Sequence, residues 1–517
     1  MPPQPSRHAA AISLALLFTA LAFLLFTRHR DFPFFYHSDE SAKVEQVMTR
    51  EYNFHHPMLL LTATGLWLGD SAARRDPQRT VEAGRLVSAA FSALAVGALV
   101  WLAMLRGGML AALATGTLLA LHQQLLELAH YMKEDPALLL GIALTFLALE
   151  GFRRRPSATR ALLLGAACGV AASGKYLGVV ALACALPVVL AAASLSGRQR
   201  AARLGLLLAG AASVFALVNL PLLGNLAASR ASLDREVGLV VEGSRGLSRS
   251  VPHTIYLNIF ADNTTPAIWL LLGVYYWRFG RTRREQDAVG WVIALFPLLL
   301  TIAFSFSPKT NDRYFLPLTA TFYYLAALGL CELIEKVLPA WRPALVRRPA
   351  LTAAAVFLAA VLLELPRTRD VLRAFQHDDR RELAEYIAAH LPPDARIVQD
   401  ERVILPSERN RRRDRIVFDL PQEVVAGKNY AAELGDLEKL RADGFTHVAV
   451  TESSYGRYFL ESMAPKAGAE GEYTQRRTFY ERLFREGTLL FERPRGTVVY
   501  LHPGLKLYRL PQSGSGL

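Results

Sequence analysis

Charged residues are scarce in this sequence of 517 residues: they make up 20%, whereas hydrophobic residues make up 52%. A soluble domain usually has about 25% charged residues. The mean hydropathy is +0.22, and the apolar residues gather in blocks of about 18 or more, the length that crosses a ~30 Å hydrocarbon core. These features exclude an ordinary soluble domain and predict a polytopic membrane protein.

Cysteine is also rare. Cys168, Cys184 and Cys331 all lie in apolar blocks and lack the spacing of a metal site. A disulfide framework or a zinc site needs several cysteines at short intervals, so we expect neither. The sequence lacks a Walker loop as well, because SGKY at residues 173–176 has no Gly-rich run before it and no Ser or Thr after its lysine.

Acidic residues are fewer than basic ones, and the net charge is +13. The arginines cluster in short loops between apolar blocks, for example at residues 153–155. Such placement follows the positive-inside rule of membrane proteins. The charge is therefore explained without nucleic acid as a partner.

Eleven apolar blocks are long enough to span a bilayer. With eleven spans the arginine-rich loops all fall on the side of the N-terminus, which we expect to be cytoplasmic. A cleavable signal peptide is the alternative for the first block, but no Ala-x-Ala-type site follows it. The stretch around Lys175 reads either as two short helices or as one broken helix. The spans start near Ala9, Val81, Gly107, Asp135, Thr159, Lys175, Leu204, Thr264, Ala288, Phe315 and Pro349.

The outer side then receives residues 28–80 and the chain after about residue 368. The spacing of Glu40, Val44 and Val47 predicts a short helix along the membrane surface within residues 28–80. Beyond Asp378, RRELAEYIAAHL predicts an amphipathic helix, and ARIVQDE, RIVFDL, THVAVTE and TVVYLH predict strands. We expect a transmembrane domain over residues 1–368 and a soluble extracytoplasmic α/β domain over residues 369–517.

Acidic side chains at the outer mouth of the helices are costly unless they are paired or functional. Asp39 and Glu40 follow the first span, and Asp39 could simply cap the surface helix. Asp135 could likewise cap the fourth span, with Pro136 at its first position. A stripe before it is expected to lie on one helical face. It consists of Gln123, Glu127, His130 and Glu134.

Four basic side chains lie near the same outer mouth or within an apolar stretch. Lys309 and Arg313 stand at a helix start, where a cation opposes the helix dipole unless an anion such as phosphate binds there. Snorkelling to the interface is the alternative. Lys175 and Arg85 lie inside apolar stretches and need water, a partner or a bound anion. Acids on one wall and cations on another suit transfer of a group from a phosphate leaving group.

In order along the chain, these motifs resemble the GT-C superfamily of membrane glycosyltransferases, in particular the branch with the protein O-mannosyltransferases and the aminoarabinose transferase of lipid A. The resemblance covers roughly Ala9 to Leu365. It rests on Asp39-Glu40, His56-Pro57, RLVSAAFSALAV, EDPALLLGIAL, GKYLG and KTNDRYFLPL.

The resemblance implies an inverting transferase with a polyprenyl-phosphate sugar as donor. It implies that Asp39 is the general base, with Glu40 in support and Asp135 as a second acid. Lys175, Lys309 and Arg313, together with Arg85, would hold the donor phosphate. Residues that would contact substrate are His56, His130, Glu134 and Tyr314.

The chain departs from the protein O-mannosyltransferases by lacking their large β-trefoil insert. A lipid or cell-envelope glycan is therefore expected as acceptor, with transfer at the outer face of a bacterial inner membrane; a protein acceptor is the alternative. We expect no cofactor and no metal site, although His37, Asp39, Glu40 and nearby histidines leave a divalent cation open.

Two other classes of protein share some of these features. A transporter or flippase would also have many spans, but it would place polar residues on both sides and often contains inverted repeats. No internal repeat is visible here. An inactive relative that binds or assembles polysaccharide is the second alternative, and its acidic residues would be dispensable.

Overall fold

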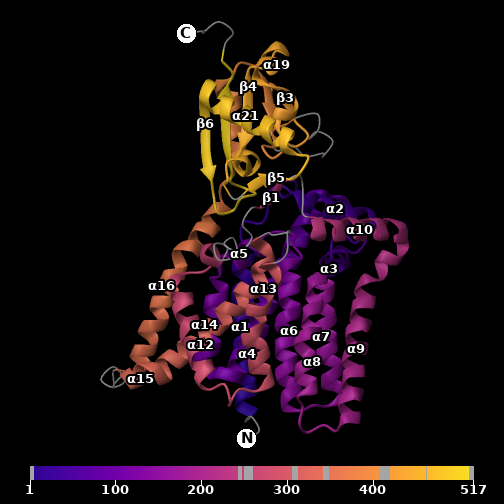
Figure 1. The fold of residues 1–517 in the computed structure, drawn as a ribbon, viewed down its shortest axis with the longest axis vertical. Helices are drawn as coiled ribbons and strands as arrows, with labels where there is room; N and C mark the ends of the chain where they lie inside the picture. The colour runs from indigo at the N-terminus through magenta and orange to yellow at the C-terminus, as the bar shows by residue number, and fades with distance from the viewer. Residues whose placement is uncertain are drawn as a thin grey trace. The chain divides into compact units, whose positions relative to one another are not determined.

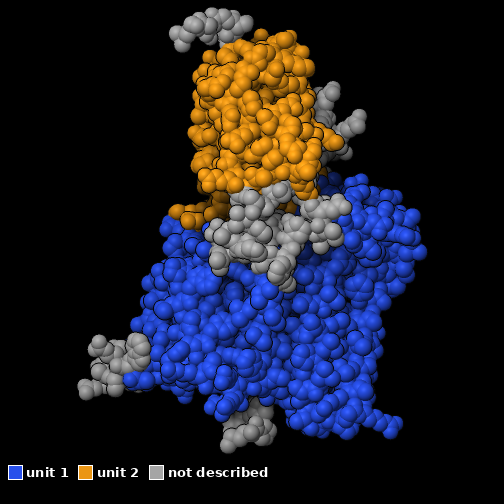
Figure 2. Space-filling view, in the orientation of Figure 1, with its two compact units in different colours: residues 1–31, 39–241, 253–369 blue, residues 32–38, 242–252, 370–517 orange. Residues whose placement is uncertain are grey.

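The computed structural model describes residues 5–242, 247–249, 260–305, 312–341, 349–406, 420–461 and 463–511. The chain divides into two compact units. Unit 1 comprises residues 1–31, 39–241 and 253–369, and unit 2 comprises residues 32–38, 242–252 and 370–517 (Figure 2). The loop RNRRRDR, the strand predicted at RIVFDL up to its last residue, and Lys309 lie outside the described residues.

Long apolar helices build unit 1, most of them running side by side (Figure 1). Five helical stretches are long and apolar enough to cross a membrane, counted over the described residues alone. Each predicted span has a corresponding helix. These helices are α1 (Pro5–Phe26), α4 (Pro77–Ala120), α6 (Asp135–Arg154), α7 (Ala158–Gly174), α8 (Val180–Leu190), α9 (Gly197–Asn219), α12 (Pro266–Arg281), α13 (Ala288–Ser305), α14 (Leu316–Glu332) and α16 (Pro349–Ala374).

Helix α4 contains two of the predicted spans, those that start near Val81 and Gly107. Its backbone is helical on both sides of Gly108, which has a φ of 78° and a ψ of −164°. A left-handed φ is costly for residues with a Cβ atom and easy for glycine. Gly108 therefore permits the kink that joins the two spans without a separate loop. After α14, a π-helical turn (Leu333–Val337) leads into α15 (Leu338–Trp341).

The stretch around Lys175 forms two helices. Helix α7 ends at Gly174, Lys175 is extended, and a 3-10 turn (Tyr176–Val179) leads into α8. The sequence allows either two short helices or one broken helix. The structure has two helices, which meet at Lys175.

Shorter helices flank the long ones. The predicted surface helix is α2 (Ser38–Thr49), in which Glu40, Val44 and Val47 are buried. Helix α3 (Met58–Leu68) is apolar but its length of about 16 Å is too short to span a bilayer. The remaining short elements are the 3-10 turns Ala72–Arg75, Leu220–Asn225 and Asp312–Phe315, and helices α5 (Gln123–Ala129) and α10 (Leu226–Glu242).

Unit 2 contains a five-stranded sheet with the order β3-β2-β4-β7-β6. Strands β3, β2 and β4 are parallel, whereas β7 is antiparallel to both β4 and β6. The strands are β2 (Arg396–Gln399), β3 (Glu423–Ala426), β4 (His447–Thr451), β6 (Thr488–Arg495) and β7 (Pro503–Arg509). A separate antiparallel pair joins β1 (Leu247–Arg249) to β5 (Met463–Pro465).

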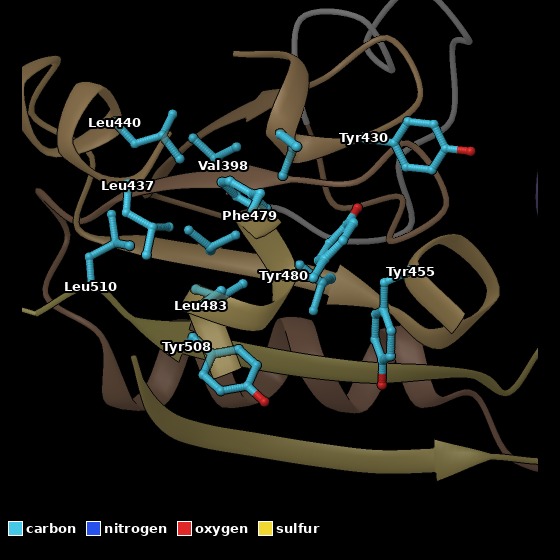
Figure 3. Packing of buried hydrophobic residues seen from close by; sticks show 14 of the residues in the cluster. Val398, Tyr430, Leu437, Leu440, Tyr455, Phe479, Tyr480, Leu483, Tyr508 and Leu510 are labelled. Carbon is cyan, nitrogen blue, oxygen red and sulfur yellow. The ribbon is translucent and has the colours of Figure 1, made fainter. Parts of the chain in front are cut away.

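Helices pack on both faces of this sheet. One face carries α19 (Leu437–Ala442) and α21 (Glu470–Glu486), whose apolar residues pack with Tyr430, Tyr455 and Tyr508 (Figure 3). Val448 belongs to the same cluster. The other face carries α17 (Asp379–His390), which packs near Ala449. Alternate residues of β4 thus enter the two cores, as expected for a strand. The remaining short elements are α20 (Glu452–Tyr455) and the 3-10 turns Ala431–Glu433 and Gly456–Tyr458.

The predicted fold class, a polytopic helical membrane protein with a C-terminal α/β part, is confirmed, and so is the amphipathic helix, which is α17. One predicted strand is wrong. TVVYLH (residues 497–502) forms the turn between β6 and β7, where the Gly496 N–H donates to the His502 carbonyl at 3.1 Å. Its branched residue Val498 is buried by tertiary packing, which local strand propensity does not distinguish from a strand position.

Candidate active site

Polar side chains from five segments of unit 1 meet beside the turn that joins α5 to α6. Helix α2 contributes residues on one face, and α4, the α7–α8 junction and the start of α14 contribute the others. We call this group the outer cluster. It consists of Asp39, Glu40, Lys43, Arg85, Lys133, Glu134, Asp135, Lys175 and Arg313.

Asp39 lies between two cations. Its Oδ2 atom accepts hydrogen bonds from Lys133 Nζ and from Arg313 Nη1, the latter at 2.8 Å. The side chain keeps 27% of its surface exposed, whereas that of Lys133 is fully buried. Of the two acids that α2 contributes to the outer cluster, Asp39 is therefore the one that a substrate can reach.

Glu40 faces the protein interior and pairs with Arg85. Arg85 Nε and Nη2 donate to the two carboxylate oxygens of Glu40 at 3.0 and 2.6 Å, and neither side chain is exposed. The Met132 N–H also donates to Glu40 at 2.7 Å, and Arg85 Nη1 donates to the Arg30 carbonyl at 2.7 Å. A buried bidentate pair of this kind is strong and geometrically specific.

Glu40 and Arg85, two of the predicted site residues, are bound to each other. The Arg85 guanidinium pairs with Glu40 in the interior, and neither side chain is exposed. Glu40 binds Arg85 and the Met132 backbone. These contacts hold α2 against the turn that carries Lys133, and the predicted roles of both residues in transfer remain predictions.

Lys43 and Glu134 form a second buried pair. Lys43 Nζ donates to Glu134 and, at 3.0 Å, to the Met132 carbonyl. Burial lowers the pKa of Lys43, which Glu134 opposes. Burial would raise the pKa of Glu134, but Lys43 and Lys133 hold it well below its usual value. Lys43 thus binds the turn through both the Met132 carbonyl and Glu134.

The backbone of this turn is held at several points. Glu40 binds the N–H of Met132 and Lys43 binds its carbonyl. The hydroxyl of Ser88 donates to the Lys133 carbonyl at 3.1 Å and accepts from the Lys133 N–H at 3.0 Å. Because both groups of two consecutive residues are bound, the direction of the Lys133 side chain toward Asp39 is set by α2 and α4.

Asp135 and Lys175 form the far wall of the cluster. Lys175 Nζ donates to Asp135 Oδ1 at 2.6 Å and lies 4.1 Å from the centre of the Tyr314 ring. Arg313 also lies over Tyr314, at 5.5 Å. Asp135 Oδ2 is buried and has no hydrogen-bond partner within the described part of the chain. An unpaired buried carboxylate oxygen is costly, so a further hydrogen bond donated to Asp135 Oδ2 would be favourable.

Asp135 does not act as a helix cap. Helix α6 begins at Asp135, and the preceding residue makes no capping bond through its side chain. The predicted stripe of Gln123, Glu127, His130 and Glu134 is also wrong, because α5 ends at Ala129 and the chain turns before Glu134. A short helix followed by a turn has polar spacing that sequence periodicity alone does not separate from one long helix.

The two predicted histidines are buried in the same region. Burial, with Lys43 as the next cause, keeps the pKa of His56 well below its usual value, and its Nε2 atom has no hydrogen-bond partner among the described residues. Burial also lowers the pKa of His130 to about 4, and its Nδ1 bonds the Leu126 carbonyl at 2.7 Å. Burial thus favours the neutral form of both rings, and His130 binds the end of α5.

Lys43 and Lys133 were missed in the sequence. Lys43 follows Asp39 by four residues, a spacing that places both on one face of a helix. Lys133 immediately precedes the predicted acids Glu134 and Asp135. Both positions are visible in the sequence, but neither shows which acid each lysine contacts in the folded protein.

A second polar cluster lies at the other end of α6, about 22 Å along the helix from Asp135. We call it the inner cluster. Its centre is Glu150, whose side chain is only 1% exposed and accepts hydrogen bonds at 2.6 to 2.7 Å from three arginines. The arginines are Arg106, Arg153 and Arg154, and Asp287 pairs with Arg106 and Arg153.

Across the described residues, no three His, Cys, Asp or Glu side chains are grouped as ligands of a metal ion. The outer cluster instead pairs each of its acids with a lysine or an arginine. Such a cluster favours an anionic ligand over a cation. The expectation that no metal is needed remains a prediction.

Comparison with known proteins agrees with the fold. Residues 62–232 match the family model described as Dolichyl-phosphate-mannose-protein mannosyltransferase. No curated protein matches the sequence. The crystal structure of ArnT from Cupriavidus metallidurans bound to undecaprenyl phosphate has 15% sequence identity and a TM-score of 0.52, covering 97% of this chain and 99% of that chain.

A second solved structure has the same fold. It is the archaeal oligosaccharyltransferase AglB from Archaeoglobus fulgidus, in complex with an inhibitory peptide and a dolichol-phosphate, with 11% identity and a TM-score of 0.50. The alignment covers 97% of this chain and 75% of that chain. The family match and the shared fold confirm the predicted resemblance to the GT-C superfamily and the predicted class, a multi-pass membrane glycosyltransferase.

Proposed function

We propose that this protein is an inverting glycosyltransferase that moves a sugar from a polyprenyl-phosphate donor to a hydroxyl group of a lipid or cell-envelope glycan. The donor class is supported by the undecaprenyl phosphate in the ArnT structure and the dolichol-phosphate in the AglB structure. The description of the matching family model also names a dolichyl-phosphate sugar. The likeness to these proteins supplies the class of donor, and the side chains of the outer cluster supply the chemistry.

The charge of the outer cluster carries the proposal. Five lysine and arginine side chains face four carboxylates there, so the described cluster has one positive charge in excess. Burying an uncompensated charge is costly, and an anion bound beside Arg313 and Lys175 would compensate it. These two cations are 18% and 15% exposed, whereas Lys43, Arg85 and Lys133 are buried. Arg313 and Lys175 are therefore the residues that would bind the donor phosphate.

The proposed reaction is a displacement at the anomeric carbon of the sugar. The acceptor hydroxyl oxygen forms the new bond to that carbon while its proton passes to the Asp39 carboxylate. The bond between the anomeric carbon and the phosphate oxygen breaks, and its electron pair stays on the polyprenyl phosphate. Arg313 and Lys175 stabilise the negative charge that develops there. Asp135 Oδ2 would accept a hydrogen bond from a hydroxyl group of donor or acceptor.

Donor binding would also change the partners of Asp39. Arg313 binds Asp39 in the structure described here, and a bound phosphate would compete for the same guanidinium. A carboxylate that loses a cationic partner holds a proton more strongly. Binding of the donor would thus make Asp39 a better base at the moment when the acceptor needs one.

We place the reaction at the outer face of the bacterial inner membrane. The outer cluster and the arginine pair Arg153–Arg154 stand at opposite ends of α6. Arginine-rich ends of membrane helices face the cytoplasm, which would put Asp135 on the extracytoplasmic side. The missing β-trefoil insert favours a lipid or glycan acceptor over a protein.

The test is sugar transfer by the purified full chain in detergent with a radiolabelled polyprenyl-phosphate sugar. Asp39→Asn should lower transfer or hydrolysis of the donor by about 10² to 10⁴-fold, the usual contribution of a general base. Asp70→Asn is the matched control, because Asp70 is also an outer-side carboxylate that pairs with an arginine but its side chain is 86% exposed. The control should keep the wild-type rate.

Two results would contradict the proposal. If Asp39→Asn transfers sugar at the rate of Asp70→Asn, Asp39 is not the base. If the wild-type protein in sealed vesicles moves the donor lipid across the bilayer without changing it, the protein is a transporter. Elution of both variants as single species at the wild-type position checks that they are folded.

A further inference from the structure

Helix α10 in unit 1 has an unusual distribution of polar and apolar residues. Its buried residues include Ser229 and Ser232, whereas Leu226, Leu233 and Val237 are 64%, 41% and 55% exposed. A helix on the surface of a soluble protein would bury its leucines and expose its serines. The exposed apolar residues of α10 therefore require an apolar partner.

The protein-facing side of α10 is bound by specific polar contacts. The hydroxyl of Ser232 accepts a hydrogen bond from the Phe54 N–H at 2.8 Å and donates to the Ser229 carbonyl at 2.8 Å. Glu236 lies 2.7 Å from the His55 Nδ1 atom. Ser232 and Glu236 are four residues apart, so they lie on one side of the helix.

The exposed apolar residues lie on a different side. Leu226, Leu233 and Val237 are separated by seven and four residues, intervals that bring them into one stripe along the helix. Arg235 is two residues from both Leu233 and Val237, about 200° around the helix, and it is exposed. Viewed along its axis, α10 thus has an apolar side, an opposite charged side, and a lateral side that binds the protein.

The apolar stripe continues the exposed face of the preceding membrane span. Leu217 at the end of α9 and Leu223 in the following turn are 68% and 63% exposed. Residues 197–238 form one apolar stretch of 42 residues; a straight helix of that length would measure about 63 Å, twice the ~30 Å hydrocarbon core. The chain breaks at Pro221, in the turn Leu220–Asn225, and α10 leaves the direction of α9 (Figure 1).

We propose that α10 lies flat in the outer headgroup–acyl boundary of the membrane and that its stripe of Leu226, Leu233 and Val237 binds bilayer lipid. Continuity with the exposed face of α9 favours lipid as the partner, because that span must itself be surrounded by lipid. Arg235 on the opposite side faces water, and Arg230, at the edge of the stripe, reaches the lipid phosphates.

The proposed location of α10 in the membrane surface has a consequence for the outer cluster. Helix α10 binds Phe54 and His55, and His56 follows them directly. Phe54 also packs against Tyr176, next to Lys175, with ring centres 5.6 Å apart. The membrane surface would therefore help to hold the segment that borders the proposed phosphate site. This consequence rests on the proposed function, whereas the location of α10 does not.

The test locates α10 by fluorescence quenching in the full chain. Single cysteines replace Leu233 or Arg235 after Cys168, Cys184 and Cys331 are changed to alanine, and each is labelled with bimane. The protein is reconstituted in phosphatidylcholine–phosphatidylglycerol vesicles. Lipids brominated near the top of the acyl chain should quench the label at Leu233→Cys about threefold more than the label at Arg235→Cys. Aqueous iodide should show the reverse order.

Two outcomes would overturn the inference. If iodide quenches both labels equally and brominated lipid quenches neither, the stripe faces water. If Leu233→Cys forms a disulfide between two copies of the chain and brominated lipid does not quench its label, the stripe binds a second copy. Both readouts are independent of sugar transfer, so the quenching experiment locates α10 even if the protein fails the transfer test.

Discussion

The outer and inner clusters of unit 1 contain the same kinds of charged side chain. They differ in where the partners of the carboxylates come from and in whether every carboxylate oxygen has a partner. In the inner cluster three arginines converge on Glu150, and two of them come from the same helix as Glu150. In the outer cluster the partners come from distant segments, and Asp135 keeps one buried oxygen without a partner in the described chain. Buried ion pairs alone therefore do not distinguish the two clusters; the unpaired oxygen of Asp135 beside the accessible Lys175 does.

The largest expected effect is a loss of stability, and it should be greater for a substitution in the outer cluster than for the same substitution in the inner cluster. Glu40→Gln leaves the Arg85 guanidinium without its carboxylate in the interior, which should cost about 3–5 kcal/mol. Glu150→Gln should cost less, because its arginines are 16% to 37% exposed and can reach water. The measurement is the temperature at which half of the detergent-solubilised protein loses its monodisperse elution.

A double substitution provides the control for this effect. Glu40→Gln with Arg85→Met removes both charges together, so it should be more stable than Glu40→Gln alone. Equal losses for Glu40→Gln and Glu150→Gln would show that the Glu40–Arg85 pair is not the stronger anchor of the two.

A smaller effect should appear in donor binding. Arg313→Gln should weaken binding of undecaprenyl phosphate about 10- to 100-fold, since a hydrogen bond to a charged group contributes about 1.5–3 kcal/mol. Arg106→Gln, the matched change in the inner cluster, should leave the Kd unchanged. Microscale thermophoresis of the two variants in one detergent compares them directly. Equal Kd values would remove Arg313 from the proposed phosphate site.

The smallest effect is a pH dependence of stability that comes from Glu134. Its pKa in the folded protein lies well below the ordinary value of 4.5. The stability that it contributes is therefore complete above about pH 4.5 and is lost as the pH falls toward the folded-state pKa. Wild type should melt above Glu134→Gln by a constant margin from about pH 7 to pH 5, and the margin should shrink at lower pH. A margin that widens on acidification would contradict the ion pair with Lys43.

Much of unit 1 could be predicted from the sequence because apolar length is a direct requirement of the bilayer. Asp39, Asp135, Lys175 and Arg313 were also identified in advance as unusual polar residues at one end of the spans, and their roles in transfer remain a proposal. What the sequence does not contain is the partner of each charge. The pairing of Glu40 with Arg85 joins residues 45 positions apart, and only the packing of α2 on α4 decides it.

In unit 2, the composition of a segment predicted one strand and failed to predict another. Strand β4 was predicted because THVAVTE is a short segment rich in Val, whereas β6, with Pro494 and few branched residues, was not predicted. An edge strand tolerates proline because one row of its backbone groups needs no partner. Pro494 makes the sequence of β6 look unlike a strand, and the position of β6 at the edge of the sheet is what tolerates this proline.

Unit 2 is built from three separate pieces of chain, and this affects the order in which the protein can fold. Residues 32–38 are synthesised early, yet the hydroxyl of Tyr36 donates to Asp378 at 2.6 Å and the His37 ring stacks on Tyr500. At a synthesis rate of about 5–20 residues per second, residues 32–38 wait about 15–70 s before residue 370 is made. Unit 2 is therefore a late product of translation, and a fragment that starts at residue 370 would lack the aromatic partners of Asp378 and Tyr500.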